Sequence, residues 1–334
     1  MSQPTRYTNN TNLSLYAQVF LATDWYDTAE AGLSVTTLIK PVRQVVLSKR
    51  VPIEAQIADL EGEIPSRNGS AIHDGFERAW KNPELSRVLA SLGLPPGMIR
   101  KVRVNPSAEE VAKGGIIACY TEVRSSIMIL GIKVTGKFDF IGDGLMEDLK
   151  NTSTFKFMST DGSDYIKQCS MYRLMNQDKV TKEHMNITFN FTDWSRRDFR
   201  MRQDVYPPAR MVTKRYNLMT IPETQAWAEE RVDLLIKCLN LPEPELPLCT
   251  PKELWQSEAV YKYYSKPENA HVPGSRSTKN FKTRREAEAY MASKKGVGVI
   301  VEKKGEVKAC LYCAGFSLCT QKDALIASGD LVLS

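Results

Sequence analysis

A predicted hairpin places two aspartates opposite each other. Asp143 and Gly144 form a typical two-residue turn flanked by apolar residues. If these two residues are the loop, the strands pair outward from Gly142 and Leu145, and Asp139 then faces Asp148. Like charges in facing positions of a sheet repel. The pairing is tolerated if a divalent cation bridges the carboxylates or if one of them takes up a proton.

Lys150 and Glu147 complete the chemistry of this hairpin. Strand alternation places Lys150 on the same face as Asp148 and Glu147 on the opposite face. Two carboxylates and an ammonium group are what metal-dependent phosphodiester hydrolysis requires: oxygen ligands for Mg²⁺ or Mn²⁺, and a cation beside the nucleophilic water or the phosphate. The alternative is a surface hairpin with a salt bridge between Asp148 and Lys150.

Four sequence blocks in order resemble the RecB-like branch of the PD-(D/E)XK nuclease superfamily. They are GSAIHDGFE, similar to the family's helical histidine motif, then GKFDFIGDG, EDLKNTS and QCSMY, the last similar to its Q-x-x-x-Y helix. The blocks lie within residues 34–239. The resemblance implies an α/β fold with a restriction-endonuclease-like core, in which helices flank a mixed central sheet.

The resemblance also implies roles for individual residues. The metal site it implies consists of His73, Asp139, Asp148 and the main-chain carbonyl of Leu149. The catalytic residues it implies are Asp139, Asp148, Lys150, Gln168 and Tyr172.

Three further positions bear on this site. Gln168 and Tyr172 are four residues apart, so they share one helical face, which the resemblance turns toward the active site and DNA. Glu77, four residues after His73, is a candidate helper. Glu122, on the strand before the hairpin, either joins the site or is an exposed strand carboxylate.

Periodicity and turn residues predict the remaining elements. Apolar spacing predicts a packed helix within residues 12–28 and a second helix, capped by Ser34, that continues through Leu47 with a solvated or phosphate-binding basic flank. Residues 116–123 and 127–134 read as two antiparallel strands joined at Arg124–Ser126. The proline-rich stretch 241–247 reads as a stiff linker between a nuclease domain, 1–240, and a C-terminal module, 241–334.

Four of the seven cysteines lie in the C-terminal module. Cys310, Cys313 and Cys319 have the spacing C-x2-C-x5-C, and Cys249 precedes them just beyond the proline-rich stretch. Four thiolates can hold zinc or an iron–sulfur cluster. The trailing C-x2-C-x5-C resembles the pattern that closes a [4Fe-4S] cluster in RecB-like nucleases, although several relatives take the fourth cysteine from before the histidine motif. Zn²⁺ is the alternative.

Composition limits the class of protein. The chain has 334 residues with 45 Lys+Arg against 39 Asp+Glu, which excludes a disordered tail protein. No apolar run approaches the roughly 20 residues that span a bilayer, and the first ten residues are polar. A cytoplasmic protein without a membrane partner is therefore expected, in the host cytoplasm if the gene belongs to a phage.

The function expected is that of a Mg²⁺- or Mn²⁺-dependent deoxyribonuclease, an exonuclease acting in phage or bacterial recombination, repair or replication. DNA is the expected partner, together with a recombinase or single-strand-binding protein. The alternatives are a DNA endonuclease and a catalytically silent DNA-end-binding scaffold of the same fold. Metal-dependent digestion of labelled DNA separates a nuclease from a scaffold.

Overall fold

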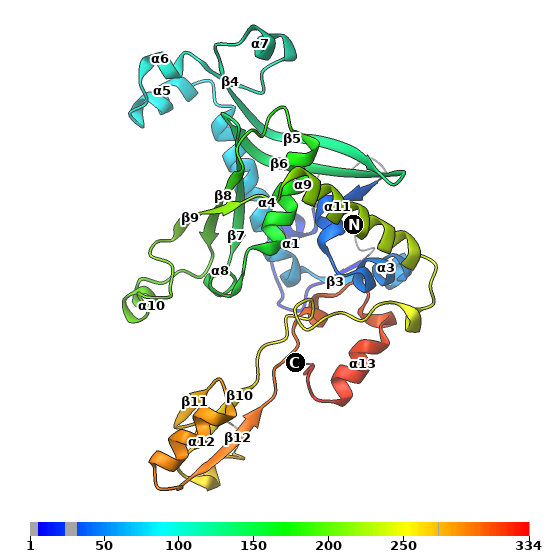
Figure 1. Ribbon diagram of the computed structural model, residues 1–334, viewed down its shortest axis with the longest axis vertical. Helices are drawn as coiled ribbons and strands as arrows, with labels where there is room; N and C mark the ends of the chain where they lie inside the picture. The colour runs from blue at the N-terminus through cyan, green and yellow to red at the C-terminus, as the bar shows by residue number, and fades with distance from the viewer. Residues whose placement is uncertain (1–5, 24–31, 273, 334) are drawn as a thin grey trace. The chain divides into compact units, whose positions relative to one another are not determined.

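The computed structural model describes residues 6–23, 32–272 and 274–333 (Figure 1). Its packing defines two compact units. Unit 1 comprises Met1–Ile39 and Ile53–Ile236, and unit 2 comprises Lys40–Pro52 and Lys237–Ser334. The boundary predicted from the sequence lies between residues 240 and 241, and it leaves residues 40–52 with the first domain. The expected functional domains stay a prediction.

Unit 1 is built on a mixed sheet that has seven strands in the described residues. The strands are β2 (Leu33–Ser34), β4 (Val102–Val104), β5 (Ile117–Ile129), β6 (Ile132–Gly142), β7 (Leu145–Thr152), β8 (His184–Phe191) and β9 (Met211–Asn217). Their order is β4-β5-β6-β7-β8-β9, with β2 paired to β6. The pairs β5–β6, β6–β7 and β8–β9 are antiparallel, whereas β4–β5, β7–β8 and β2–β6 are parallel. A separate parallel pair joins β1 (Arg6–Thr8) to β3 (Ile57–Asp59).

The core of unit 1 follows from strand alternation. Every second residue of β8 is buried, which is the period-two pattern of a strand with one face against the core. Phe138, Ile141, Met146, Ile187 and Phe189 are all buried on adjacent strands. On β8 a slip by one residue would turn the buried set outward, which fixes its register, whereas β6 buries Phe138 and Ile141 on opposite faces of the sheet.

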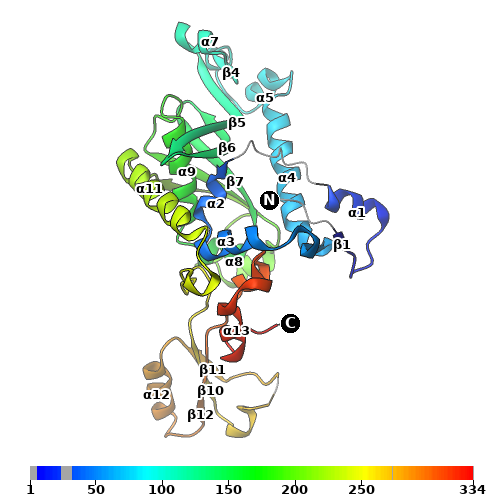
Figure 2. The same cartoon turned by 90° about the vertical axis from the view of Figure 1, so that its right-hand side faces the viewer.

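Helices flank the sheet of unit 1. Their bounds are α1 (Leu15–Ala22), α2 (Val35–Ile39), α4 (Leu60–Trp80), α5 (Leu85–Ser91), α6 (Pro96–Ile99), α7 (Ala108–Lys113), α8 (Thr154–Ser159), α9 (Ser163–Met175), α10 (Arg196–Met201) and α11 (Ile221–Cys238), with a 3₁₀ turn at Ile53–Ala55. Helix α4 contacts β5 and β7, and α9 contacts β5 and β6. Figure 2 shows α4 on one side of these strands and α9 on the other. The expected α/β class, with a mixed sheet between helices, is confirmed at this level.

Two hairpin turns determine how the central strands meet. Asp143 and Gly144 have φ values of 48° and 80°, as a two-residue primed turn requires, and the hairpin pairs Gly142 with Leu145 as predicted. The turn predicted at Arg124–Ser126 was wrong, because β5 runs straight through it. The chain turns instead at Leu130 and Gly131, where positive φ values of 48° and 77° close the β5–β6 hairpin.

Two helix predictions need correction. Ser34 caps α2 through the amide of Thr37, but the helix does not continue to Leu47: α2 ends at Ile39 and α3 begins at Val42, because Pro41 breaks the backbone ladder. Helix α1 is shorter than expected and leaves Tyr16 90% exposed, so the predicted packed face is wrong there. The part of that prediction at residues 24–28 lies outside the described residues.

Unit 2 combines turns around the cysteines with a small sheet. Its elements are α3 (Val42–Arg50), β10 (Val260–Tyr264), β11 (Lys279–Phe281), α12 (Arg284–Ser293), β12 (Val299–Lys303), α13 (Thr320–Ala327) and 3₁₀ turns η2 (Glu243–Glu245), η3 (Pro267–Asn269), η4 (Ala309–Tyr312) and η5 (Phe316–Leu318). The strands form an antiparallel sheet in the order β11-β10-β12, which α12 contacts (Figure 1). Over the part of the chain that the structure describes, no helix is long and apolar enough to span a membrane.

Candidate metal centre and cysteine cluster

Three carboxylates form a row across strands β5, β6 and β7. The pairs Thr121↔Phe140 and Val123↔Phe138 enclose Glu122 and Asp139, so these two residues lie opposite each other. The β6–β7 register, continued one residue beyond Phe140↔Glu147, brings Asp148 beside Asp139. The sheet therefore gathers Glu122, Asp139 and Asp148 from three neighbouring strands.

Glu122 occupies a strained backbone position. Its φ of 54° is in the left-handed region, which costs a non-glycine residue about 1–3 kcal/mol. The β5–β6 register is the same on both sides of it, so no residue is inserted. Strain of this kind persists where the surrounding structure fixes it, and it is concentrated at functional sites.

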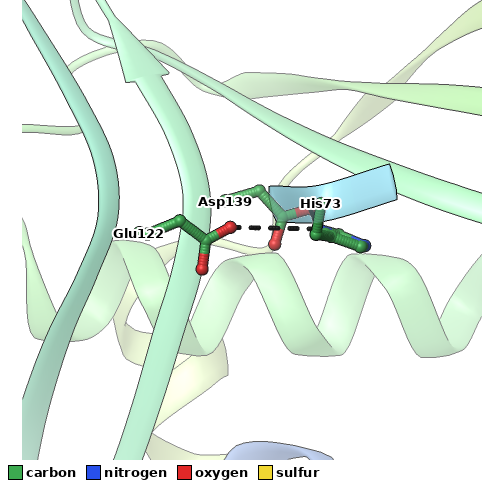
Figure 3. Close-up of side chains that lie close together, drawn as sticks. All are labelled: His73, Glu122 and Asp139. Carbon is green, nitrogen blue, oxygen red and sulfur yellow. Dashed lines mark ion pairs between the residues drawn. The ribbon is translucent and has the colours of Figure 1, made fainter. Parts of the chain in front are cut away.

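Asp139 is the centre of the group (Figure 3). Its Oδ2 lies 3.4 Å from Nδ1 of His73, which comes from α4, and accepts a 2.7 Å hydrogen bond from the Leu149 amide. The His73 Nδ1 is also 3.9 Å from Oε1 of Glu122. One ligand atom each from His73, Glu122 and Asp139 can be chosen so that all three lie within 4.8 Å of one another. This spacing suits a single metal ion.

Two lysines pair with the outer carboxylates of the row. Lys137 Nζ is 2.6 Å from Glu122 Oε2, and Lys150 Nζ is 2.6 Å from Asp148 Oδ2. The Asp148 side chain is 2% exposed, and neither of its oxygens accepts a well-directed hydrogen bond from the described residues. A buried carboxylate with unfilled acceptor positions is suited to a cation.

A hydrogen-bonded chain extends from Lys150 into α9. Lys150 Nζ donates to Oε1 of Gln168 at 3.2 Å, and Gln168 Nε2 donates to the hydroxyl of Tyr172 at 3.1 Å. Gly136 makes room for the buried Tyr172 ring, because a Cβ at residue 136 would lie 2.5 Å from it. The chain fixes the orientation of the ammonium group.

Burial and charge set the protonation of the site. Burial, followed by the charge of Asp148, raises the pKa of Asp139 well above its usual range. Burial also lowers the pKa of His73, which favours the neutral, ligating imidazole. For Lys150, burial acts to lower the pKa, but the charges of Asp148 and Asp139 outweigh it and the net shift is upward. Lys150 therefore remains a cation.

A pocket of about 130 Å³ opens onto this group. Trp80 and Phe140 both line it, and their ring centroids are 4.4 Å apart. Glu77, the candidate helper, also lines the pocket but is paired with Lys81. Glu147 lines it too, although strand alternation had placed Glu147 on the face opposite Asp148.

The predicted site residues come together only in part. His73, Asp139, Asp148, Lys150, Gln168 and Tyr172 are linked by the contacts described above. The close group around His73 contains Glu122 and not the predicted ligand Asp148, and Leu149 contacts Asp139 through its amide. The ligand roles of Asp148 and of the Leu149 carbonyl stay predictions. Lys137 was missed; its position two residues before Asp139 on the same strand was the available signal.

The four C-terminal cysteines lie near one another in unit 2. Cys249 and Cys310 pack against the buried Leu254, Val307 and Leu331. Burial, with further contributions from Glu253 and the other three thiols, raises the pKa of Cys249 to about 12. Without a metal the Cys249 thiol holds its proton, and a bound metal would displace that proton. The other cysteines, Cys119, Cys169 and Cys238, are buried.

Two residues tie the cluster to its surroundings. Gln321 accepts from the Cys249 amide and donates to the Cys249 carbonyl, at 2.8 and 2.9 Å. Arg43 of α3 is 2% exposed and donates from Nε to the Cys319 Sγ at 3.2 Å, while its charge is balanced by Glu243. The basic flank predicted for this segment comprises Lys40, Arg43, Lys49 and Arg50, and the prediction that it is solvated or binds phosphate is wrong for Arg43.

Comparison with known proteins leaves the family open. No family model matches the chain, and no curated protein matches it. A solved structure titled "Crystal structure of SSO0001" is similar at 16% sequence identity and a TM-score of 0.39, covering 68% of this chain and 86% of that one. At that TM-score the likeness says nothing about family or function.

Proposed function

We propose that the chain is a metal-dependent DNA nuclease with a PD-(D/E)XK core of the RecB-like type, working as an exonuclease. The observation that carries the proposal is the row of Glu122, Asp139 and Asp148 across three strands, with His73 beside it. Four ligating groups gathered at one pocket, among them a buried Asp148 whose Oδ2 is paired with Lys150 while its Oδ1 has no hydrogen-bond partner among the described residues, suit one or two divalent cations.

The residues present fit Mg²⁺ or Mn²⁺. Carboxylate oxygens are the preferred ligands of both ions, and a neutral histidine adds preference for Mn²⁺. Such an ion supplies Lewis-acid activation of a phosphodiester. His73, Glu122 and Asp139 would hold it, with Asp148 and the Leu149 carbonyl as further ligands.

The other residues act on the substrate and its surroundings. Lys150, held by Asp148 and Gln168, places an ammonium group beside the carboxylate row, where it orients the attacking water or neutralises charge on the scissile phosphate. Gln168 and Tyr172 position Lys150. Trp80 and Phe140 form an apolar wall of the pocket, which limits water around the reacting groups.

For the cysteine cluster the proposal is a [4Fe-4S] cluster, with Zn²⁺ as the alternative. The support for the cluster is the spacing C-x2-C-x5-C of Cys310, Cys313 and Cys319, because the x5 gap is looser than the second C-x2-C of a zinc ribbon.

The cellular setting of the proposal is DNA recombination, repair or replication in a phage or bacterium. DNA is the substrate, a recombinase or single-strand-binding protein is the protein partner, and the host cytoplasm is the location.

Digestion of end-labelled DNA tests the function. The purified protein is expected to digest a linear duplex or single strand from an end in Mg²⁺ or Mn²⁺, to stop in excess EDTA, and to leave covalently closed circles intact. Cleavage of closed circles would make it an endonuclease. DNA binding without cleavage in any divalent metal would favour the silent end-binding scaffold, and undiminished cleavage in EDTA would overturn the metal proposal.

A further inference from the structure

The small sheet of unit 2 carries the positive charge of the whole protein. Residues 260–303, here called the basic arm, contain ten Lys and Arg against four Glu and no Asp, a formal charge of +6. The entire chain also has a formal charge of +6, so the other residues together are neutral. Such an uneven distribution of charge indicates what kind of partner the protein binds, and it does not indicate the fold.

Two of the four carboxylates of the arm are engaged by neighbouring groups. Glu288 pairs with Arg284 at 2.9 Å, and Glu286 accepts from the Thr283 amide in the capping box of α12. Five cations on β11, α12 and the segments after them have no ion pair with a carboxylate of the described residues: Lys279, Lys282, Arg285, Lys294 and Lys295. All five side chains are exposed.

Two of these cations lie beside one aromatic ring of the arm. Lys279 Nζ lies 4.7 Å from the centroid of the Tyr290 ring, and Lys294 Nζ lies 5.4 Å from the same centroid. Lys279 comes from β11 and Lys294 from the end of α12, so the fold brings the two ammonium groups to one aromatic ring. Two ammonium groups beside one ring raise the local positive potential, which favours binding of the phosphates of a nucleic-acid backbone.

The arm is anchored at its base. It is inserted between Cys249 and Cys310, and its two ends are joined where the Ser257 amide donates to the Glu306 carbonyl at 3.1 Å. The Lys308 amide donates to the Leu254 carbonyl, beside the cysteine-bearing core. A phosphate bound at the arm would therefore be held against a fixed base.

From the charge and its placement we infer that the basic arm binds the phosphate backbone of nucleic acid, without reading sequence. The inference rests on the proposed function in naming DNA as the ligand, but not on hydrolysis. The exposed groups are cations without exposed aromatic rings among them, which favours backbone contacts over base stacking. Each phosphate neutralised on a duplex adds about 0.9 to the slope of log K against log salt.

Binding of a fluorescent 30-base-pair duplex to the full chain in EDTA tests the arm, because no cleavage takes place there. The variant Lys279→Gln, Lys282→Gln, Lys294→Gln is expected to bind at least about tenfold more weakly at 0.1 M salt and to lose about 2–3 from the salt slope. The matched control, Lys101→Gln, Lys113→Gln, Lys182→Gln, removes the same charge from exposed positions of unit 1 and is expected to change the slope by less than about 1.

A footprint on the wild-type protein avoids any effect of substitution on folding. Duplex DNA is expected to protect Lys279, Lys282, Lys294 and Lys295 from acetylation, and not Lys101 or Lys113. Equal weakening in both triple variants, an unchanged slope in the arm variant, or unprotected arm lysines would each overturn the inference. So would binding of anionic phosphatidylserine vesicles in place of DNA. If the arm binds DNA as expected but the protein cleaves no DNA, the nuclease proposal is rejected and the inference about the arm stands.

Discussion

The carboxylate row of unit 1 and the cysteine cluster of unit 2 are held in opposite ways. Glu122, Asp139 and Asp148 lie on three hydrogen-bonded strands of a large sheet. Cys310 lies in a short 3₁₀ turn and Cys319 directly follows another, and the buried apolar cluster beside them is Leu254, Val307 and Leu331. The first centre is formed by its scaffold, whereas the second, if it holds the proposed cluster, would depend on the group that it binds.

The difference has an energetic meaning. A preformed acidic row destabilises the metal-free fold, because facing carboxylates repel each other. Cysteines on short turns do the reverse: the bound group closes loops that a small core cannot order alone, so binding contributes folding free energy. Substitution of a metal-ligating residue should therefore abolish cleavage when the residue lies in unit 1, and abolish the ordered structure when it lies in unit 2.

The largest effect is expected in unit 2. Cys313→Ser should abolish protease resistance of residues 237–334 and leave that of unit 1, since structural thiolate sites contribute about 10 kcal/mol or more. Limited proteolysis with mass spectrometry measures this. Cys238→Ala, a buried cysteine outside the cluster, is the control and should retain both resistance and metal. If unit 2 of Cys313→Ser stays resistant to protease, its structure does not depend on the bound group, and the two centres do not differ as described.

Asp139→Asn should lower the cleavage rate by about 10³-fold, because it removes several kcal/mol of transition-state stabilisation. Its circular dichroism and protease resistance should match those of the wild type. The control is Asp143→Asn, an exposed carboxylate on the same hairpin, which should cleave normally. Loss of structure in Asp139→Asn would mean that the row supports the fold and is not a preformed centre.

Arg43→Met tests how the cysteine cluster is supported. Loss of the Arg43 contact to Cys319 also leaves the Glu243 carboxylate without its cation, and breaking such a buried pair costs about 3–5 kcal/mol. The melting temperature of unit 2 and its metal content should both fall. Lys49→Met, an exposed residue on the same helix, should change neither. In the double variant Arg43→Met/Glu243→Gln no unpaired carboxylate remains. If this variant regains the melting temperature but not the metal content, the Arg43 contact to Cys319 supports metal binding independently of the pair with Glu243.

The smallest effect concerns the metal-free carboxylate row. Because the fold raises the pKa of Asp139, the folded protein binds protons more tightly than the unfolded chain, and stability in EDTA should fall as pH rises from the ordinary aspartate range to the raised pKa. Asp139→Asn should remove this pH dependence and raise the melting temperature at neutral pH by about 2 °C. Thermal melts against pH measure it, and a lower melting temperature for Asp139→Asn would contradict it.

The sequence predicted the first centre better than the second. The Asp143–Gly144 turn determines the β6–β7 register by local chemistry, so the pairing of Gly142 with Leu145 could be predicted. Glu122 could only be left open, because its position depends on the β5–β6 register. The predicted turn of the β5–β6 hairpin, at Arg124–Ser126, was wrong. No residue of that segment indicates that the strand continues through it.

The surroundings of the cysteines were beyond sequence reasoning. Their spacing indicates a metal group, but the contact from Arg43 to Cys319 joins residues 276 positions apart. A basic residue on a short helix normally faces solvent, and its burial here depends on Glu243 and on main-chain carbonyls far along the chain. Long-range partners of this kind do not appear in local periodicity.

The proposal that the carboxylate row is a metal centre is tested most directly by the anomalous difference map of a crystal of the full chain soaked in Mn²⁺. A manganese peak is expected, bonded to Asp139 and to His73 or Glu122, absent from Asp139→Asn crystals and retained in Asp143→Asn crystals. A map with no peak at these residues, or with a peak unaffected by Asp139→Asn, would contradict it.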